Sequence, residues 1–136
     1  MTLNEVTLID FPKILDPRGN LSFLQNNTQI PFEVQRVYWI YDVPGGEQRG
    51  GHAYRSLQEI IIALSGSFDV VIFDGVKERT ISLNRSYYGL YIPKMFWRHL
   101  ENFSTNSIAF IAADQPYKEE EYIRDLQEYK THVLEK

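Results

Sequence analysis

The sequence predicts an all-β protein, a barrel or sandwich that ends in one C-terminal α-helix. Apolar runs are short and mostly end at Gly, Pro, Asn or Asp, which is typical of strands joined by turns. The expected strands recur about every ten residues, a spacing found in β-sandwiches and barrels. With 136 residues and 43% hydrophobic composition, the chain is expected to form a single domain over residues 1–136.

The first third of the chain contains the strongest strand signal. Strands are expected at residues 6–9 and 21–25, separated by a turn at residues 16–20 with Pro and Gly in turn-compatible order. Residues 34–41 are almost all β-favouring. We expect that strand to be buried on both faces, or to be buried against another subunit.

The remaining strands follow in quick succession, with Asp74-Gly75 as a hairpin turn. Their expected ranges are 51–55, 59–64, 67–73, 79–83, 87–92, 97–103 and 107–112. From residue 117 the apolar spacing changes, because Tyr122, Leu126, Tyr129 and Val133 recur at steps of three and four residues. This pattern predicts one amphipathic helix over about residues 118–134 that covers the outside or an end of the barrel.

Charge and cysteine content exclude several classes of partner. The formal net charge of −4 provides no overall attraction to nucleic acid or to an anionic membrane. The chain has no cysteine, so disulfides and thiolate metal sites are excluded. The first twenty residues contain acidic residues and prolines that a signal peptide would not carry, and no apolar run is long enough to span a membrane. We therefore expect a soluble cytoplasmic protein.

One stretch carries the spacing of a metal-binding motif, with one ligand changed. Gly46 is followed by His52, then by Tyr54 two residues later, by Glu59 and by Gly66. This spacing resembles the first signature of the cupin barrels, except that Tyr54 stands where a second histidine is expected. Because side chains alternate along a strand, His52 and Tyr54 should both point into the barrel. The alternative is that His52 bonds a backbone carbonyl and Tyr54 reaches solvent.

The second cupin signature is altered as well, which argues against a metal. Pro93, Met95, Arg98 and Asn102 lie at its positions, so Arg98 replaces a ligand histidine. A guanidinium stays protonated and cannot coordinate a cation. Only His52 and Glu59 remain as donors, too few for a transition metal, and no cofactor is expected. His99 should point to the opposite face, as a surface or packing residue, unless a bulge exchanges it with Arg98.

Arginines gather around the same region of the sequence. Arg36, Arg49, Arg55 and Arg98 form a local positive field in an acidic protein, which favours a phosphorylated ligand. The alternative is that each arginine pairs with a surface carboxylate. Nearby aromatic side chains could stack on a base or sugar, although strand aromatics are more often core or subunit interface. These aromatics are Tyr38, Trp39, Tyr41, Tyr91 and Trp97.

Taken together, these residues resemble one branch of the cupins, the WxcM-like sugar-nucleotide 3,4-ketoisomerases that act on dTDP-4-dehydro-6-deoxy-glucose. The resemblance runs nearly end to end. It is carried by residues 16–19, 30–32, 36–38, 49–53 and 89–93, by Trp97, and by residues 122–125 in the expected helix. It implies a jelly-roll homodimer without metal that holds a nucleotide-linked keto sugar in the barrel mouth, in the synthesis of surface polysaccharide.

The resemblance also implies roles for individual residues. His52 matches the first histidine of the family's His-Ala-His unit, Tyr54 replaces the second, and Arg55 replaces the usual lysine. His52 and Tyr54 are thus the expected catalytic pair, with His52 as the proton shuttle and Tyr54 as acid or oxyanion donor. Arg18 and Arg98 match positions that line the sugar. The expected substrate-binding set is Arg18, Arg36, Tyr38, Arg49, Arg55, Tyr91 and Arg98.

Two other functions compete with this interpretation. A barrel that binds a sugar nucleotide or carbohydrate without converting it is favoured by the change at Tyr54. A metal-dependent cupin enzyme would need His52 and Glu59 to find a further ligand.

Overall fold

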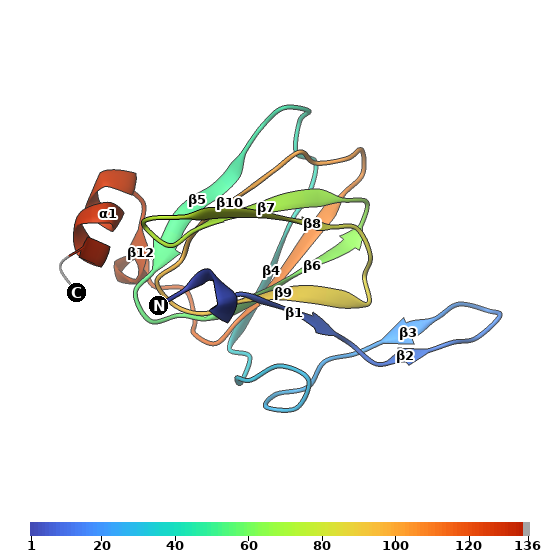
Figure 1. Ribbon diagram of the computed structural model, residues 1–136. Helices are drawn as coiled ribbons and strands as arrows, with labels where there is room; N and C mark the ends of the chain where they lie inside the picture. The colour runs from blue at the N-terminus through green and yellow to red at the C-terminus, as the bar shows by residue number, and fades with distance from the viewer. Residues whose placement is uncertain (135–136) are drawn as a thin grey trace.

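Two five-stranded antiparallel sheets face each other in the computed structural model, which describes residues 1–134 (Figure 1). The first sheet has the order β1 (Thr7–Asp10), β9 (Tyr88–Ile92), β6 (Glu59–Ser65), β11 (Ile108–Ala113) and β4 (Arg36–Ile40). The second has the order β12 (Tyr122–Ile123), β5 (Arg49–Tyr54), β10 (Trp97–Glu101), β7 (Phe68–Phe73) and β8 (Glu78–Leu83). A short 3-10 helix, η1 (Leu3–Glu5), precedes β1. The all-β prediction is confirmed.

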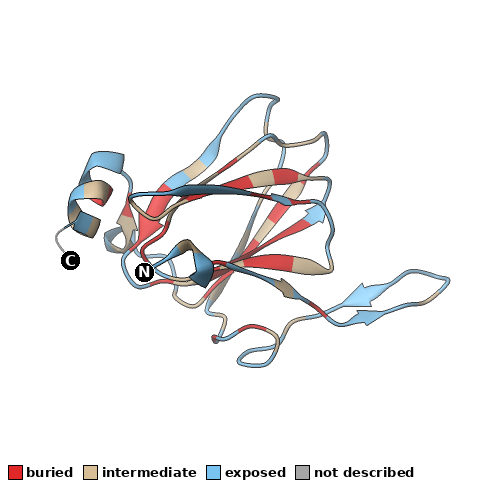
Figure 2. Ribbon diagram, viewed as in Figure 1, coloured by how far each residue is buried: buried red, intermediate tan, exposed pale blue. Residues whose placement is uncertain are grey.

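The main hydrophobic core fills the space between the two sheets. Strand alternation sends every second side chain inward, where apolar burial stabilises the barrel. Figure 2 shows the buried stretches on the facing strands of both sheets. The core includes Ile61, Leu90 and Ile111 from the first sheet, and Val70, Ile72 and Leu100 from the second. One end of the same interior is lined by polar side chains, which form the candidate site.

A second cluster covers the outer face of the first sheet. The segment between β3 and β4 crosses this face, and its Ile30 and Phe32 pack with Phe11 on Ile60 and Ile62. Tyr91 packs on the same cluster from β9. The outward side chains of β6 and β9 are therefore core residues of this layer.

A two-stranded arm projects from the barrel. Among the described residues, strands β2 (Lys13–Ile14) and β3 (Leu21–Ser22) pair only with each other, and Figure 1 shows them extending away from both sheets. The turn between them contains Gly19, whose φ of 133° suits glycine. The strand predicted at residues 21–25 is thus shorter than expected. Strand β2 was not predicted.

Strand β4 differs from its prediction in burial. In the part of the chain that the structure describes, it pairs with β11 alone and forms one edge of the first sheet. Arg36, Tyr38 and Ile40 point inward, whereas Val37 is 45% and Trp39 is 56% exposed. Burial on both faces is therefore wrong within this chain, because no element from residues 1–134 covers the outward face. Burial against another subunit stays a prediction.

The C-terminal helix is shorter than predicted. Residues 118–134 form a 3-10 turn, η2 (Glu119–Glu121), then β12, and only then α1 (Leu126–Leu134). Tertiary contacts override the helical spacing, because Ile123 is buried and β12 pairs with β5. The Asp125 side chain accepts hydrogen bonds from the backbone N–H groups of Gln127 and Glu128 and so starts α1. Over residues 1–134, no helix combines the length and hydrophobicity that crossing a membrane requires.

Candidate active site

Strands β5 and β10 place three of the predicted residues on one inner face. His52 and Arg98 are register partners across the two strands, and Tyr54 lies two residues further along β5. His52 is 5% exposed and Tyr54 is 3% exposed. The predicted inward direction of His52 and Tyr54 is confirmed. His99 points to the outer face, as predicted, and contacts Glu101 there.

Arg98 and Glu59 form a buried ion pair at the centre of the site. Both side chains are 1% exposed, and two guanidinium nitrogens of Arg98 donate to the two Glu59 oxygens at 3.0 and 2.9 Å. Burial opposes the charged form of Arg98, yet Glu59 and the neighbouring Tyr38 and Tyr54 together outweigh it and hold the pKa of Arg98 well above its ordinary value. The pair is thus charged but internally neutralised.

Gly50 shapes β5 around this arginine. Its carbonyl accepts a hydrogen bond from Arg98 Nη1 at 3.0 Å, and the strand register shifts beside it, between Arg98 and Leu100. The φ of Gly50 is +73°, and a Cβ at this position would lie 2.2 Å from Nη1. Glycine is therefore required here by both conformation and space.

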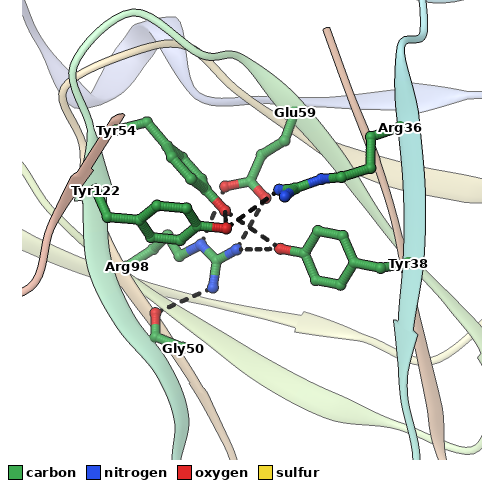
Figure 3. A network of polar contacts seen from close by, with 7 residues as sticks. All are labelled: Arg36, Tyr38, Gly50, Tyr54, Glu59, Arg98 and Tyr122. Atoms are coloured by element: carbon green, nitrogen blue, oxygen red, sulfur yellow. Dashed lines mark hydrogen bonds and ion pairs between the residues drawn. The ribbon is translucent and has the colours of Figure 1, made fainter. Parts of the chain in front are cut away.

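Three tyrosine hydroxyls extend the network from the ion pair (Figure 3). Arg98 Nη2 donates to Tyr38 at 3.0 Å, and the hydroxyls of Tyr38 and Tyr54 are 3.4 Å apart. Tyr54 in turn donates to the Tyr122 hydroxyl at 3.5 Å, and Arg36 Nη2 donates to the same oxygen at 3.2 Å. The network joins five strands of both sheets.

Tyr122 was missed as a site residue. Its spacing assigned it to a helix, but it lies on β12 directly opposite Tyr54. One signal was present, because residues 122–125 belong to the motifs that carried the family resemblance. The carboxylate of Glu121 fixes this strand by accepting hydrogen bonds from the N–H groups of Ser56 and Leu57.

His52 lies in an aromatic enclosure with one nitrogen free. Its ring centroid is 4.6 Å from that of Tyr54 and 4.9 Å from that of Tyr122. Within residues 1–134, the buried Nε2 atom has no hydrogen-bond partner. Burial, followed by the positive charge of Arg98, lowers the pKa of His52 to about 2. The imidazole is therefore neutral at pH 7. Because Tyr54 is buried beside it, the alternative in which Tyr54 reaches solvent is wrong.

The phenols beside His52 also resist ionisation. Burial, and then the nearby Glu59 carboxylate, raises the pKa of Tyr54 far above its ordinary value. Burial likewise raises the pKa of Tyr38. Both groups therefore remain hydroxyls that donate and accept hydrogen bonds.

Of the other predicted residues, Arg36 belongs to the network and Arg49 lies beside it. Arg36 is half-buried, lies 4.9 Å from the centre of the Tyr38 ring, and has a buried Nε without a partner within residues 1–134. Arg49 and Tyr38 both line a cleft of about 470 Å³ along β4. This cleft offers space for a ligand next to the network.

The remaining three predicted residues lie away from both the network and this cleft. Arg55 is on the exterior, where it pairs with Glu128 at 3.3 Å. Arg18 is on the projecting arm and pairs with Asp16. Tyr91 lies on the outer face of the first sheet. Residues 1–134 contain no group of three His, Asp or Glu side chains placed to hold a metal ion.

Comparisons with known proteins connect this site to a family. The model of the FdtA family, described as WxcM-like, C-terminal, matches residues 4–134. The chain belongs to this family. A TDP-4-oxo-6-deoxy-α-D-glucose 3,4-oxoisomerase from Aneurinibacillus thermoaerophilus is 36% identical over 129 residues, covering 95% of this chain and 93% of that protein.

Solved structures agree with the family assignment. QdtA, a sugar 3,4-ketoisomerase from Thermoanaerobacterium thermosaccharolyticum solved with TDP, superposes with a TM-score of 0.96 at 32% identity and 98% coverage of both chains. A 3,4-ketoisomerase from Helicobacter canadensis gives 0.93 at 38% identity, with 96% of this chain and 98% of that chain covered. The family resemblance and the cupin-type jelly roll predicted from the sequence are confirmed.

Proposed function

We propose that the protein is a metal-independent 3,4-ketoisomerase that acts on TDP-4-keto-6-deoxyglucose or a similar nucleotide keto sugar. The observation that carries this proposal is the neutral His52, whose free Nε2 lies inside the barrel within a positively charged surrounding. The family membership and the activities named for its relatives support the same reaction. We infer a cytoplasmic role in polysaccharide synthesis from this substrate class.

The electrostatics of the site fit an enediolate reaction. Moving a ketone from C4 to C3 requires removal of the C3 proton, stabilisation of an enediol or enediolate, and protonation of C4. The positive charges that disfavour imidazolium at His52 favour negative charge on the substrate. When His52 takes the C3 proton, the developing imidazolium and the negative charge that develops on the substrate oxygen stabilise each other. Burial thus keeps His52 unprotonated until substrate binds.

A deuterium-exchange experiment tests the proposal. Purified protein incubated with TDP-4-keto-6-deoxyglucose in heavy water should incorporate deuterium and form the 3-keto isomer. His52→Gln should abolish both while retaining TDP binding, because it removes the base and leaves Arg98 in place. Tight binding by the unmodified protein without exchange or isomer formation would instead favour the binding-module function.

We further propose a homodimer in which the arm of one subunit reaches the site of its partner. The 90% exposed Arg18 side chain lies on the projecting arm, so it can line a sugar only in another subunit. The exposed Val37 and Trp39 on edge strand β4 provide an apolar surface for association.

Subunit mixing tests the shared site. Arg18→Ala and His52→Gln proteins should each be impaired alone. Refolded together, they should recover part of the activity, because one kind of mixed site then carries both wild-type residues. Absence of recovery, with mixed dimers demonstrated by mass spectrometry, would contradict the shared site.

A further inference from the structure

Two arginines fix the direction of the hydrogen bonds at the two ends of the tyrosine network, whereas in the Tyr38–Tyr54 contact either hydroxyl can donate. A guanidinium only donates, so the Tyr38 hydroxyl accepts from Arg98 and the Tyr122 hydroxyl accepts from Arg36. Tyr54 also donates to Tyr122. The three phenols therefore form one continuous chain of exchangeable protons that begins beside the buried ion pair and ends at Tyr122 (Figure 3).

The two ends of this chain differ in charge. At the Tyr38 end, the charge of Arg98 is already neutralised by the bidentate contact with Glu59. At the Tyr122 end, Arg36 is in no ion pair with any residue from 1 to 134, although its guanidinium bonds the Tyr122 oxygen at 3.2 Å. The Arg124 guanidinium also lies 4.2 Å from the Tyr122 ring centre, but it is paired with Glu119 at 2.8 Å, so Arg36 is the cation that distinguishes this end. A transient phenolate is therefore best stabilised at Tyr122.

Tyr54 itself is a poor place for negative charge. It is 3% exposed, and the Glu59 carboxylate disfavours a second anion beside it. If Tyr54 gave its proton to substrate without receiving another, it would become an unfavourable buried phenolate. A neighbour that supplies a proton at the same moment removes this cost.

We propose that Tyr122 is a positioning residue that acts through Tyr54. During each turnover it passes a proton to the Tyr54 hydroxyl and takes it back. This inference rests on the proposed ketoisomerase function. It explains how a tyrosine performs the role of the second histidine, since Tyr54 then relays protons without ionising. Arg36 acts through Tyr122 by holding the transient charge.

The proton balance closes without a co-reactant. In the first step His52 takes the C3 proton. The Tyr54 hydroxyl, which donates to Tyr122 before substrate binds, turns to the substrate and gives its proton to O4, and Tyr122 gives its own proton to the Tyr54 oxygen. The products of this step are a neutral enediol, an imidazolium and a Tyr122 phenolate. In the second step the imidazolium protonates C4, the O3 proton passes to Tyr54, and Tyr54 returns a proton to Tyr122. The ketone is then at C3 and every protein group is restored.

Tyr122→Phe is the direct test, because it removes the hydroxyl and keeps the ring that packs on His52. We expect kcat for TDP-4-keto-6-deoxyglucose to fall about 100-fold or more, with KM nearly unchanged. Tyr117→Phe is the matched control, since the Tyr117 hydroxyl bonds the exposed Glu119 and the change keeps the ring that packs on Tyr122, and it should retain the unmodified kcat. Loss of less than about threefold in Tyr122→Phe, in a protein whose unmodified form is active, overturns the relay.

A double-mutant cycle separates the relay from a structural role. If Arg36 acts through the Tyr122 oxygen, Arg36→Gln should lower kcat in the unmodified protein but cause little further loss in Tyr122→Phe. Additive losses would contradict the relay. Should Tyr122→Phe fold poorly, fluorotyrosine at position 122 provides a second test, and it should retain activity because it keeps an ionisable hydroxyl. An inactive unmodified protein would refute the proposed function instead.

Discussion

The polar groups inside this barrel are arranged by charge. Glu59 and Arg98 neutralise each other, His52 is kept uncharged, and Arg36 retains a charge without an ion-pair partner within residues 1–134. Removing even a half-buried unpaired charge from solvent is costly, so this arrangement indicates a site prepared for an anion rather than one optimised for stability. The ion pair and His52 should therefore affect the free energy of unfolding in different ways.

The buried ion pair predicts that replacing one partner lowers the free energy of unfolding much more than replacing both partners with apolar residues. Glu59→Gln leaves Arg98 charged and buried without an anion and should lower the free energy of unfolding by about 3–5 kcal/mol. The combined change Glu59→Leu with Arg98→Met should recover most of this loss. Urea denaturation measures both.

An exposed ion pair supplies the control for this experiment. Glu128→Gln removes the same kind of partner from Arg55 on the surface, where solvent screens the interaction, and should cost less than about 1 kcal/mol. Equal losses from Glu59→Gln and Glu128→Gln would show that burial does not set the cost.

The depressed pKa of His52 predicts a pH dependence of stability. The pKa is about 2 in the folded protein and 6.5 as its ordinary value, so the unfolded chain binds more protons between these limits. The contribution of His52 is therefore complete above its ordinary pKa and is lost as the pH falls toward 2. Between pH 7 and pH 5 the free energy of unfolding should drop by about 2 kcal/mol more in the unmodified protein than in His52→Gln. Denaturation curves at the two pH values check this, and parallel behaviour of the two proteins would contradict it.

At the scale of elements, β5 shapes the site both through its regular strand alternation and through its bulge. Alternation from His52 to Tyr54 turns both side chains inward, while the bulge at Gly50 turns a carbonyl toward Arg98. Strand β12 then adds Tyr122 opposite Tyr54. The alternation was predictable from the sequence, because it depends on local geometry alone. The position of Tyr122 was not, since it depends on a pairing between residues far apart in the chain.

Gly50→Ala should distort the site through the backbone. Alanine disfavours the φ of +73°, and its Cβ would press on Arg98 Nη1. We expect a loss of about 1–3 kcal/mol in the free energy of unfolding, together with loss of the C3 exchange reaction. Gly45→Ala is the matched control, because a Cβ there meets nothing within 4 Å. Unchanged stability and exchange in Gly50→Ala would refute the requirement for glycine.

At the scale of the whole molecule, the apolar edge strand and the arm remain without partners in one chain. Val37 and Trp39 on β4 are exposed, and so are Ile14 and Leu21 on the arm. Figure 2 shows the arm as exposed along nearly all its length. Association through these surfaces would bury them and bring Arg18 near a second barrel.

The β4 surface predicts how the proposed dimer should respond to charge. The unmodified protein should sediment as a dimer, and Val37→Glu should shift it to monomer because a carboxylate is costly to bury in an apolar interface. Val76→Glu, at an exposed apolar position in the β7–β8 turn, should remain dimeric. Sedimentation velocity distinguishes these outcomes, and a monomeric unmodified protein would refute the dimer.

The sequence by itself determined the all-β fold, the family and the inward pair His52 and Tyr54. These follow from turn residues, strand alternation and motif spacing, all of which are local in the chain. Only the tertiary structure decided that Arg98 pairs with Glu59, that Arg18 and Arg55 lie outside the network, and that Tyr122 belongs to a strand beside Tyr54. These contacts join distant segments. Their formation depends on burial and pairing across the barrel, which can override helical spacing and give similar arginines different surroundings.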